Sequence, residues 1–318
     1  MAFSIPHCFK PALLLGLDID PTAIRMVELS HRPERGFRLE RYAQRALPEG
    51  AVSDQHIDHP GQLAEHIAAT ARQLGSQRKR VALALPAHAV ITRRMQVPAT
   101  IAEQALNDLI TAEAGAWLTV TPDQVRVDYQ FCSIDGKDDI DDSDPAQRHI
   151  VLAAARREQV EDRIAAVEAA GLIPEVLDID LYAAHAACVH ASTVPAYSAL
   201  LMPGASMTQI ALFDRHQLLY RRELPGCSNA EGSDTLQIAI AATRAIQLAT
   251  PTGMTLAHIF IGGDYTAPTQ LAQAMQSQST SNTRCSAAHP FAAMEMPEAT
   301  AYLVACGLAM RRTSRAAS

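Results

Sequence analysis

A short hairpin near the N-terminus carries residues whose types and spacing could bind a phosphate group. It contains the stretch LLLGLDID, in which Gly16 and Asp18 stand in an arrangement that phosphate-binding hairpins often use. The turn itself is Asp20-Pro21, which adds a negative charge and a residue without an N–H group. The stretch leaves two alternatives: a hairpin that holds a nucleotide, or one that has kept the shape and lost the ligand.

Composition limits the classes of protein to which the chain could belong. Its 318 residues predict about two domains, and the 48% of hydrophobic residues can form sizeable cores, mostly from Ala, Leu, Ile and Val because aromatics make up only 5%. The net charge of −7 argues against binding to nucleic acid or to anionic lipid. Six scattered Cys without a CxxC motif predict reduced thiols in a cytosolic protein and no structural zinc.

Neither a targeting segment nor a membrane span is expected. The run PALLLGL is interrupted by Asp18 too early for a signal peptide, and no apolar run approaches the roughly 18–20 residues of a span. We therefore expect a soluble protein whose link to a membrane goes through a partner. The acidic stretch DGKDDIDDSDPAQ, residues 135–147, is interpreted as a solvated loop, because it lacks the ligand order and central Gly of a calcium-binding loop.

Hydrophobic periodicity predicts two halves with the same order of elements. Each half begins with a meander of three strands and continues with a helix and a further strand. The predicted strands are 12–18, 23–29, 36–43, 80–85, 90–97, 125–133, 149–155, 175–179, 197–202, 207–213, 218–224 and 257–261. The predicted helices are 60–74, 101–117, 158–170, 234–249, 268–276 and 299–312.

This duplicated order resembles the α/β architecture of the actin-like ATPases, which have a ribonuclease H-like fold. Four segments, in order, also resemble the type IV pilus assembly protein PilM family. They are GLDIDPTAIRMVELS, VALALPAHAVITRRMQVPA (Val81–Ala99), LAAARREQVEDRIAAVEAAGLIPEVLDIDLYAAHAA (Leu152–Ala187) and AYLVACGLAMRR (Ala301–Arg312). The alternative is an unrelated α/β protein with a chance Gly turn.

The resemblance implies an FtsA-like layout of two actin-like domains. Domain 1 would span 12–190, with a small subdomain inserted at about 86–172. Domain 2 would span 191–312 and would be reduced, with a shortened helical subdomain. Only seven residues separate Gly226 from the helix expected at Asp234, where the family normally has that subdomain.

The resemblance also implies where ATP and Mg²⁺ would lie if nucleotide binding is retained. Backbone N–H groups of the first turn of each half would bind the phosphates, and a Gly-Gly turn would support the adenosine. Asp18 would order the Mg²⁺ shell; the alternative is a strand-end Asp that bonds its own turn. The residues at these positions are Asp18, Thr22, Gly204, Ser206, Thr208, Gly262 and Gly263.

Several residues at these turns depart from the family pattern. Asp20 and Pro21 replace small hydroxyl residues, and a like-charge contact of Asp20 with a phosphate at about 4 Å would cost about 1–4 kcal/mol. Met202-Pro203-Gly204 replaces Asp-Ile-Gly, so the carboxylate expected to position metal or water is gone. Asp264 adds a charge after the Gly-Gly turn. Each change disfavours ATP, so the sequence predicts a weak or lost nucleotide site without catalytic residues.

The family's role implies a cytoplasmic scaffold that binds the N-terminal tail of a PilN-like inner-membrane protein, together with other pilus platform components. The tail would use the inserted subdomain, along 90–97 and 101–117, by strand addition or in an apolar groove. Trp117 would be an anchor there or a core residue. One alternative is an active ATPase in which Asp178 and Asp180 replace the missing carboxylate. Another is a type II secretion platform component, although those continue into a span that this chain does not show before Ser318.

Overall fold

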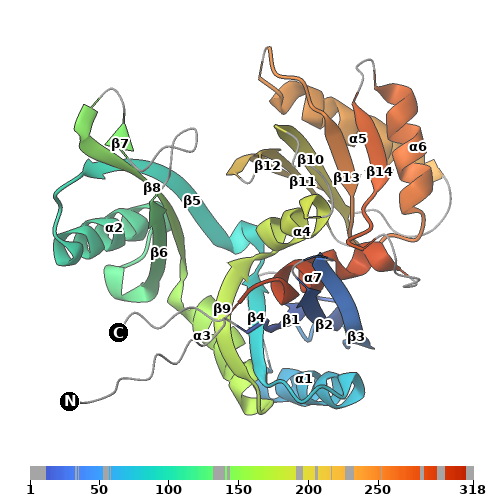
Figure 1. Ribbon diagram of the computed structural model, residues 1–318, viewed down its shortest axis with the longest axis horizontal. Helices are drawn as coiled ribbons and strands as arrows, with labels where there is room; N and C mark the ends of the chain where they lie inside the picture. The colour runs from blue at the N-terminus through green and yellow to red at the C-terminus, as the bar shows by residue number, and fades with distance from the viewer. Residues whose placement is uncertain are drawn as a thin grey trace.

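The computed structural model of the chain consists of two similar halves and an inserted sheet (Figure 1). It describes residues 12–32, 34, 36–52, 57, 59–131, 140–141, 144–190, 196–204, 207–215, 217–225, 233–251, 253–279, 283–291 and 298–312. All structural statements below refer to these residues.

The first half is a five-stranded sheet with two of its helices on the face turned away from the second half. Its elements are β1 (Leu15–Ile19), β2 (Ala23–Arg32), β3 (Gly36–Ala46), α1 (Pro60–Leu74), β4 (Arg80–Leu85), α3 (Arg157–Ala169) and β9 (Ile173–Ile179). The strand order is β3-β2-β1-β4-β9, with β1–β2 and β2–β3 antiparallel and the remaining pairs parallel. α1 begins at Pro60 and ends where Gly75 adopts a left-handed conformation, as its sequence predicts.

The second half repeats this topology. Its elements are β10 (Tyr197–Pro203), β11 (Met207–Asp214), β12 (Gln217–Pro225), α5 (Ser233–Ala249), β13 (His258–Ile261), α6 (Pro268–Gln278) and β14 (Arg284–Ala287). The order β12-β11-β10-β13-β14 matches the first sheet strand for strand, again with an antiparallel meander and two parallel strands. The predicted duplication is therefore confirmed, and β14 is an additional strand that the sequence pattern did not indicate.

The inserted sheet lies apart from both halves, at the left of Figure 1. Its elements are η1 (Ala87–Ala89), β5 (Val90–Pro98), α2 (Glu103–Leu118), η2 (Pro122–Gln124), β6 (Val125–Phe131), β7 (Ile140–Asp141) and β8 (Asp144–Arg156). The order is β5-β8-β6, β7 pairs with β8, and α2 covers an apolar face. α3 instead packs against α1 and adds Ala166 and Val167 to the first half's core. The boundaries at 86–172, 190 and 312 stay predictions.

One part of the acidic stretch is not the loop that the sequence suggested. β8 begins at Asp144, so residues 144–147 are strand, because the backbone of β8 pairs with β7 and, at Gln147, with Pro98 of β5. Backbone pairing extends the strand beyond its apolar residues. Residues 135–139 and 142–143 lie outside the described residues.

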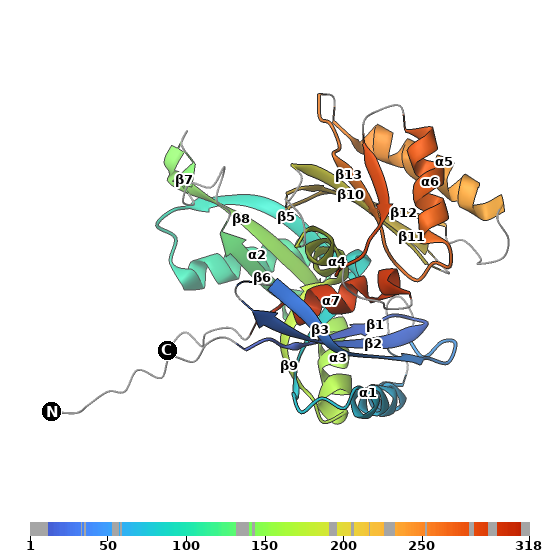
Figure 2. The ribbon, with the colours of Figure 1, turned by 45° about the vertical axis from the view of Figure 1, so that its right-hand side comes forward.

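Two buried helices, α4 (Asp180–Val189) and α7 (Leu303–Ala309), lie between the two five-stranded sheets (Figure 2). Glycine lets them approach closely: a Cβ on Gly307 would lie 1.8 Å from the carbonyl oxygen of Ala183. α7 follows η3 (Ala299–Tyr302) and ends at Ala309, so the single helix predicted over 299–312 is wrong at both ends. No helix in the described part of the chain has the length and apolar composition to cross a membrane.

Candidate functional site

The first turn, between β1 and β2, uses its hydrogen-bond donors internally. Oδ1 of Asp20 accepts the backbone N–H of Thr22 at 2.9 Å and also the Thr22 hydroxyl. The N–H of Asp20 donates to the carbonyl of Ala23 at 3.0 Å, and Pro21 has no N–H. Asp20 therefore binds the donors of Thr22, the residue predicted to contact phosphate, as Asp side chains commonly do in turns. No N–H or hydroxyl of residues 20–22 is left without an acceptor.

Asp18 lies on the face of the first sheet that points toward the second half, and it is only 9% exposed. Burial raises the pKa of its carboxyl to about 7; Arg25 and Arg163 act in the opposite direction, while Asp20 and Asp180 add to the rise. A carboxylate must be ionised to bind a metal ion. Because burial raises the pKa of this carboxyl, binding a Mg²⁺ ion here near neutral pH would have to release a proton from Asp18.

Arg25 connects the two halves beside Asp18. Arg25 is the register partner of Asp18 on β2, and it is 2% exposed. Its Nη2 donates to Oδ2 of Asp264 at 2.5 Å, and its Nε donates to Oε1 of Gln44 at 3.0 Å. Asp264 was expected to repel a phosphate. In the structure its carboxylate is paired with a cation of the chain itself, Arg25.

The described residues of the turn in the second half present no exposed hydroxyl or carboxylate. Gly204 lies between β10 and β11, and a Cβ there would lie 2.9 Å from the carbonyl oxygen of Met207. Thr208 is 1% exposed, whereas Ser206 lies outside the described residues. Met202 and Pro203 end β10, so no carboxylate stands where the family pattern has one.

The Gly-Gly turn after β13 is filled by the chain itself. A Cβ on Gly262 would lie 2.3 Å from Cδ1 of Leu303, and a Cβ on Gly263 would lie 2.6 Å from the carbonyl oxygen of Pro203. Gly263 has φ +80°, and its N–H donates to the carbonyl of Thr300 at 3.0 Å. Contacts within the protein are therefore sufficient to require both glycines.

Asp178 and Asp180, the two acids that could replace the missing carboxylate, have different surroundings. Oδ2 of Asp178 accepts Nε and Nη2 of Arg311 at 2.7 and 2.5 Å, which ties the C-terminal segment to β9. Oδ1 of Asp180 accepts the backbone N–H groups of Ala87 and Leu181 at 2.9 and 2.6 Å. Burial raises the pKa of Asp180 to about 6, although these hydrogen bonds oppose the rise. Of these two acids, Asp180 is the one that affects the pKa of Asp18.

Arg163 of α3 belongs to this group of charges, and the sequence analysis missed it. Burial lowers the pKa of its guanidinium, Asp18 and Asp180 oppose this, and no described residue accepts a hydrogen bond from Nη1. A usable signal existed: Arg163 falls on the apolar stripe of its helix, three residues after Val160 and three before Ala166, both of which are buried. A charge at such a position indicates burial against opposite charges.

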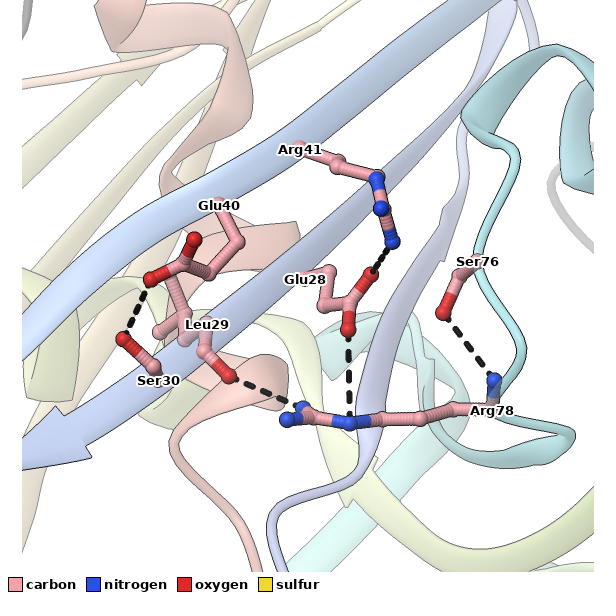
Figure 3. Close-up of polar contacts among 7 residues, drawn as sticks. All are labelled: Glu28, Leu29, Ser30, Glu40, Arg41, Ser76 and Arg78. Atoms are coloured by element: carbon pink, nitrogen blue, oxygen red, sulfur yellow. Dashed lines mark hydrogen bonds and ion pairs between the residues drawn. The ribbon is translucent and has the colours of Figure 1, made fainter.

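A second cluster of charges, shown in Figure 3, stabilises the first sheet away from these turns. Glu28 of β2 is buried and accepts Arg41 of β3 at 3.0 Å, and it lies 3.4 Å from Nε of Arg78. Arg78 also donates to the carbonyl of Leu29 at 2.8 Å. The cluster links β2, β3 and the segment before β4.

The predicted partner surface on the insert consists of an edge strand and a covered aromatic ring. β5 pairs with β8 on one side and ends the described sheet on the other. The guanidinium of Arg93 lies 4.6 Å from the ring centre of Trp117, which is half-buried against the core under α2. Arg94 bonds to Gln217 of β12. Trp117 is thus a core residue capped by a cation, rather than an exposed anchor.

Comparison with solved structures shows the same fold in several proteins. A PilM–PilN type IV pilus biogenesis complex matches with a TM-score of 0.75 and 21% identity, over 94% of this chain and 98% of that one. The ethanolamine utilization protein EutJ from Carboxydothermus hydrogenoformans matches with a TM-score of 0.51 and 12% identity, over 95% and 90%. A diol dehydratase-reactivating factor in nucleotide-free form matches with 0.55 and 7%, over 93% and 98%.

These matches establish the actin-like ATPase fold. The family model described as type IV pilus assembly protein PilM matches residues 16–230, which is more than half of the sequence. The chain therefore belongs to the PilM family of type IV pilus assembly proteins.

Proposed function

We propose that the chain is a cytoplasmic scaffold of the type IV pilus inner-membrane platform, with weak or lost ATP binding. It would bind the cytoplasmic N-terminal tail of a PilN-like membrane protein and contact other platform components. In this way it would support twitching motility. The observation that carries this proposal is the PilM family match, because residues 16–230 include the first half and the whole insert. The chain would be peripheral to the inner membrane through its partner.

The weak or lost ATP binding follows from the residues at the turns. A phosphate at the first turn would have to displace Asp20 from Thr22, and Pro21 supplies no donor. The chain fills the space beside Gly262 and Gly263, and Asp264 would repel a phosphate placed near Arg25. These residues do not fit Mg-ATP well, so we assign no catalytic step to them.

The open edge of β5 is the surface that we propose for the partner's tail. An extended peptide can add to such an edge through main-chain hydrogen bonds. β5 spans Val90–Pro98, and its exposed Arg93 and Arg94 would favour a tail with acidic residues near that edge.

The test is the binding of a fluorescent synthetic peptide with the PilN tail sequence, followed by anisotropy with and without Mg-ATP. We expect saturable binding that Mg-ATP does not change. Arg94→Glu should weaken it about tenfold or more, since charge reversal at an interface costs more than about 1.4 kcal/mol. The matched control is Arg244→Glu, another exposed arginine, on α5. No binding, or binding only with Mg-ATP, would refute the proposal.

The alternative is an active ATPase, and one observation favours it. Asp18, Asp180 and the buried Arg163 interact electrostatically, and Nη1 of Arg163 has no hydrogen-bond partner among the described residues. Such a group could bind a phosphate and its metal ion after a rearrangement. Mg-dependent release of phosphate from ATP that disappears in Asp180→Asn would support this alternative.

A further inference from the structure

The two halves are packed together along one side by apolar residues. The largest core contains residues of the first sheet, such as Val27, and of the second sheet, such as Phe213, with α4 and α7 between them. His185 of α4 bonds to Ser198 of β10 at 2.9 Å and stacks on Phe213 with ring centres 3.8 Å apart. Near the turns, polar side chains add contacts to those of this core.

We infer that the Arg25–Asp264 ion pair holds the two halves together at these turns in the absence of a nucleotide. Its two members are 239 residues apart in sequence and belong to different halves. Arg25 is almost fully buried, and its other described partner, Gln44, is neutral. A buried guanidinium needs a compensating charge, and Asp264 supplies it from the opposite half.

The position of Asp264 is fixed by its own half. It directly follows Gly263, whose positive φ and whose bond to Thr300 define the turn. A Cβ on Gly263 would collide with Pro203, so the turn is also held against the end of β10. A fixed backbone therefore holds the carboxylate next to Arg25. The two halves could not separate at this point without breaking the ion pair.

Further polar contacts reach the second half from α4 and from the insert. The side chain of Gln209 on β11 hydrogen-bonds to Asp180 at the start of α4. Nδ1 of His88 in η1 lies 3.9 Å from Oε1 of Glu223 on β12. Asp180 lies close enough to Asp18 to affect its pKa, and Asp18 itself is buried.

This arrangement has a consequence for regulation that rests on the proposed function. If an ion pair of the chain fixes the relative position of the halves, the insert is presented to the partner's tail constitutively. Tail binding would then not depend on a bound nucleotide, and the scaffold would not cycle between nucleotide states.

The test is hydrogen–deuterium exchange of the full chain, comparing Asp264→Asn with the wild type. Because opening free energies set exchange rates, we expect exchange at residues 19–25, in the opposite half, to rise on the order of tenfold. Exchange in α1 should stay unchanged. Asp123→Asn, which removes an exposed carboxylate of η2, is the matched control and should behave as the wild type. Mg-ATP should leave the wild-type exchange at 19–25 unchanged.

Wild-type exchange at residues 19–25 in Asp264→Asn would overturn the inference, as would slower exchange of the wild type with Mg-ATP. Arg25→Gln, read at residues 260–265, provides the reciprocal measurement. If this variant does not fold, Asp264→Asn still decides, because Asp264 is half-exposed. Tail binding is measured separately on the wild type. If the tail does not bind, the proposed function is refuted but the inference about the ion pair is not. If exchange in Asp264→Asn stays at the wild-type rate, the inference about the ion pair is refuted but the proposed function is not.

Discussion

Replacing Asp18 by Asn tests whether the carboxyl between the two halves is held in a dry environment. Burial raises its pKa from 3.8 to about 7, so between about pH 4 and 7 the folded chain holds a proton that the unfolded chain has released. Stability is therefore favoured at low pH and falls as the pH rises through this window. The rise in pKa corresponds to a loss of about 4 kcal/mol by pH 8, at about 1.4 kcal/mol per pH unit.

Asn cannot ionise, so the stability of Asp18→Asn should not fall in this way as the pH rises. Relative to the wild type, we expect it to be equally stable within about 1 kcal/mol at pH 4 and more stable by about 2–4 kcal/mol at pH 8. The assay is urea unfolding followed by circular dichroism at several pH values, with the free energies of unfolding compared. A difference that does not change with pH would refute the reasoning. A wild type that is more stable at pH 8 would show that Arg25 and Arg163 keep Asp18 ionised.

Two further predictions concern packing and buried charge. Gly307→Ala should lower the free energy of unfolding by about 3 kcal/mol or more, because the added Cβ would lie 1.8 Å from the Ala183 carbonyl and the backbone must shift. The control is Gly61→Ala, because nothing lies within 4 Å of its added Cβ. It should change the free energy of unfolding by less than about 1 kcal/mol. An equal loss in both variants would contradict the packing argument. Glu28→Gln should cost about 1–3 kcal/mol, because it leaves Arg78 without its carboxylate partner in a mostly buried site. Urea unfolding measures this, and an unchanged midpoint would show that the cluster in Figure 3 contributes no stability.

Much of the fold could be predicted from local patterns. α1 and β4 have the predicted bounds, since Pro60 and Gly75 mark the helix ends and an unbroken apolar run marks the strand. No helix was predicted at α4, because its apolar residues surround the helix and show no single apolar face. β14 has only four residues, RCSA, and forms because β13 offers a parallel edge. That pairing depends on tertiary structure, which a local pattern does not contain.

The candidate site was predictable only in part, for a similar reason. Asp18, Gly262 and Gly263 could be assigned because the family resemblance gives their positions, and the structure brings these turns together through Pro203 and the Arg25–Asp264 contact. Arg25 was not singled out, because an arginine in an alternating strand is normally interpreted as solvent-exposed. Its partner Asp264 is a residue of the other half, which no local pattern connects to it.

We propose that the chain keeps the actin-like fold without effective nucleotide binding. The most direct test is titration of the purified protein with a fluorescent ATP analogue and Mg²⁺, repeated with Asp18→Ala. We predict no saturable binding up to about 1 mM, a limit that corresponds to about −4 kcal/mol, and no difference between the two proteins. Saturable micromolar binding that disappears in Asp18→Ala would contradict the account and make Asp18 a nucleotide-site residue.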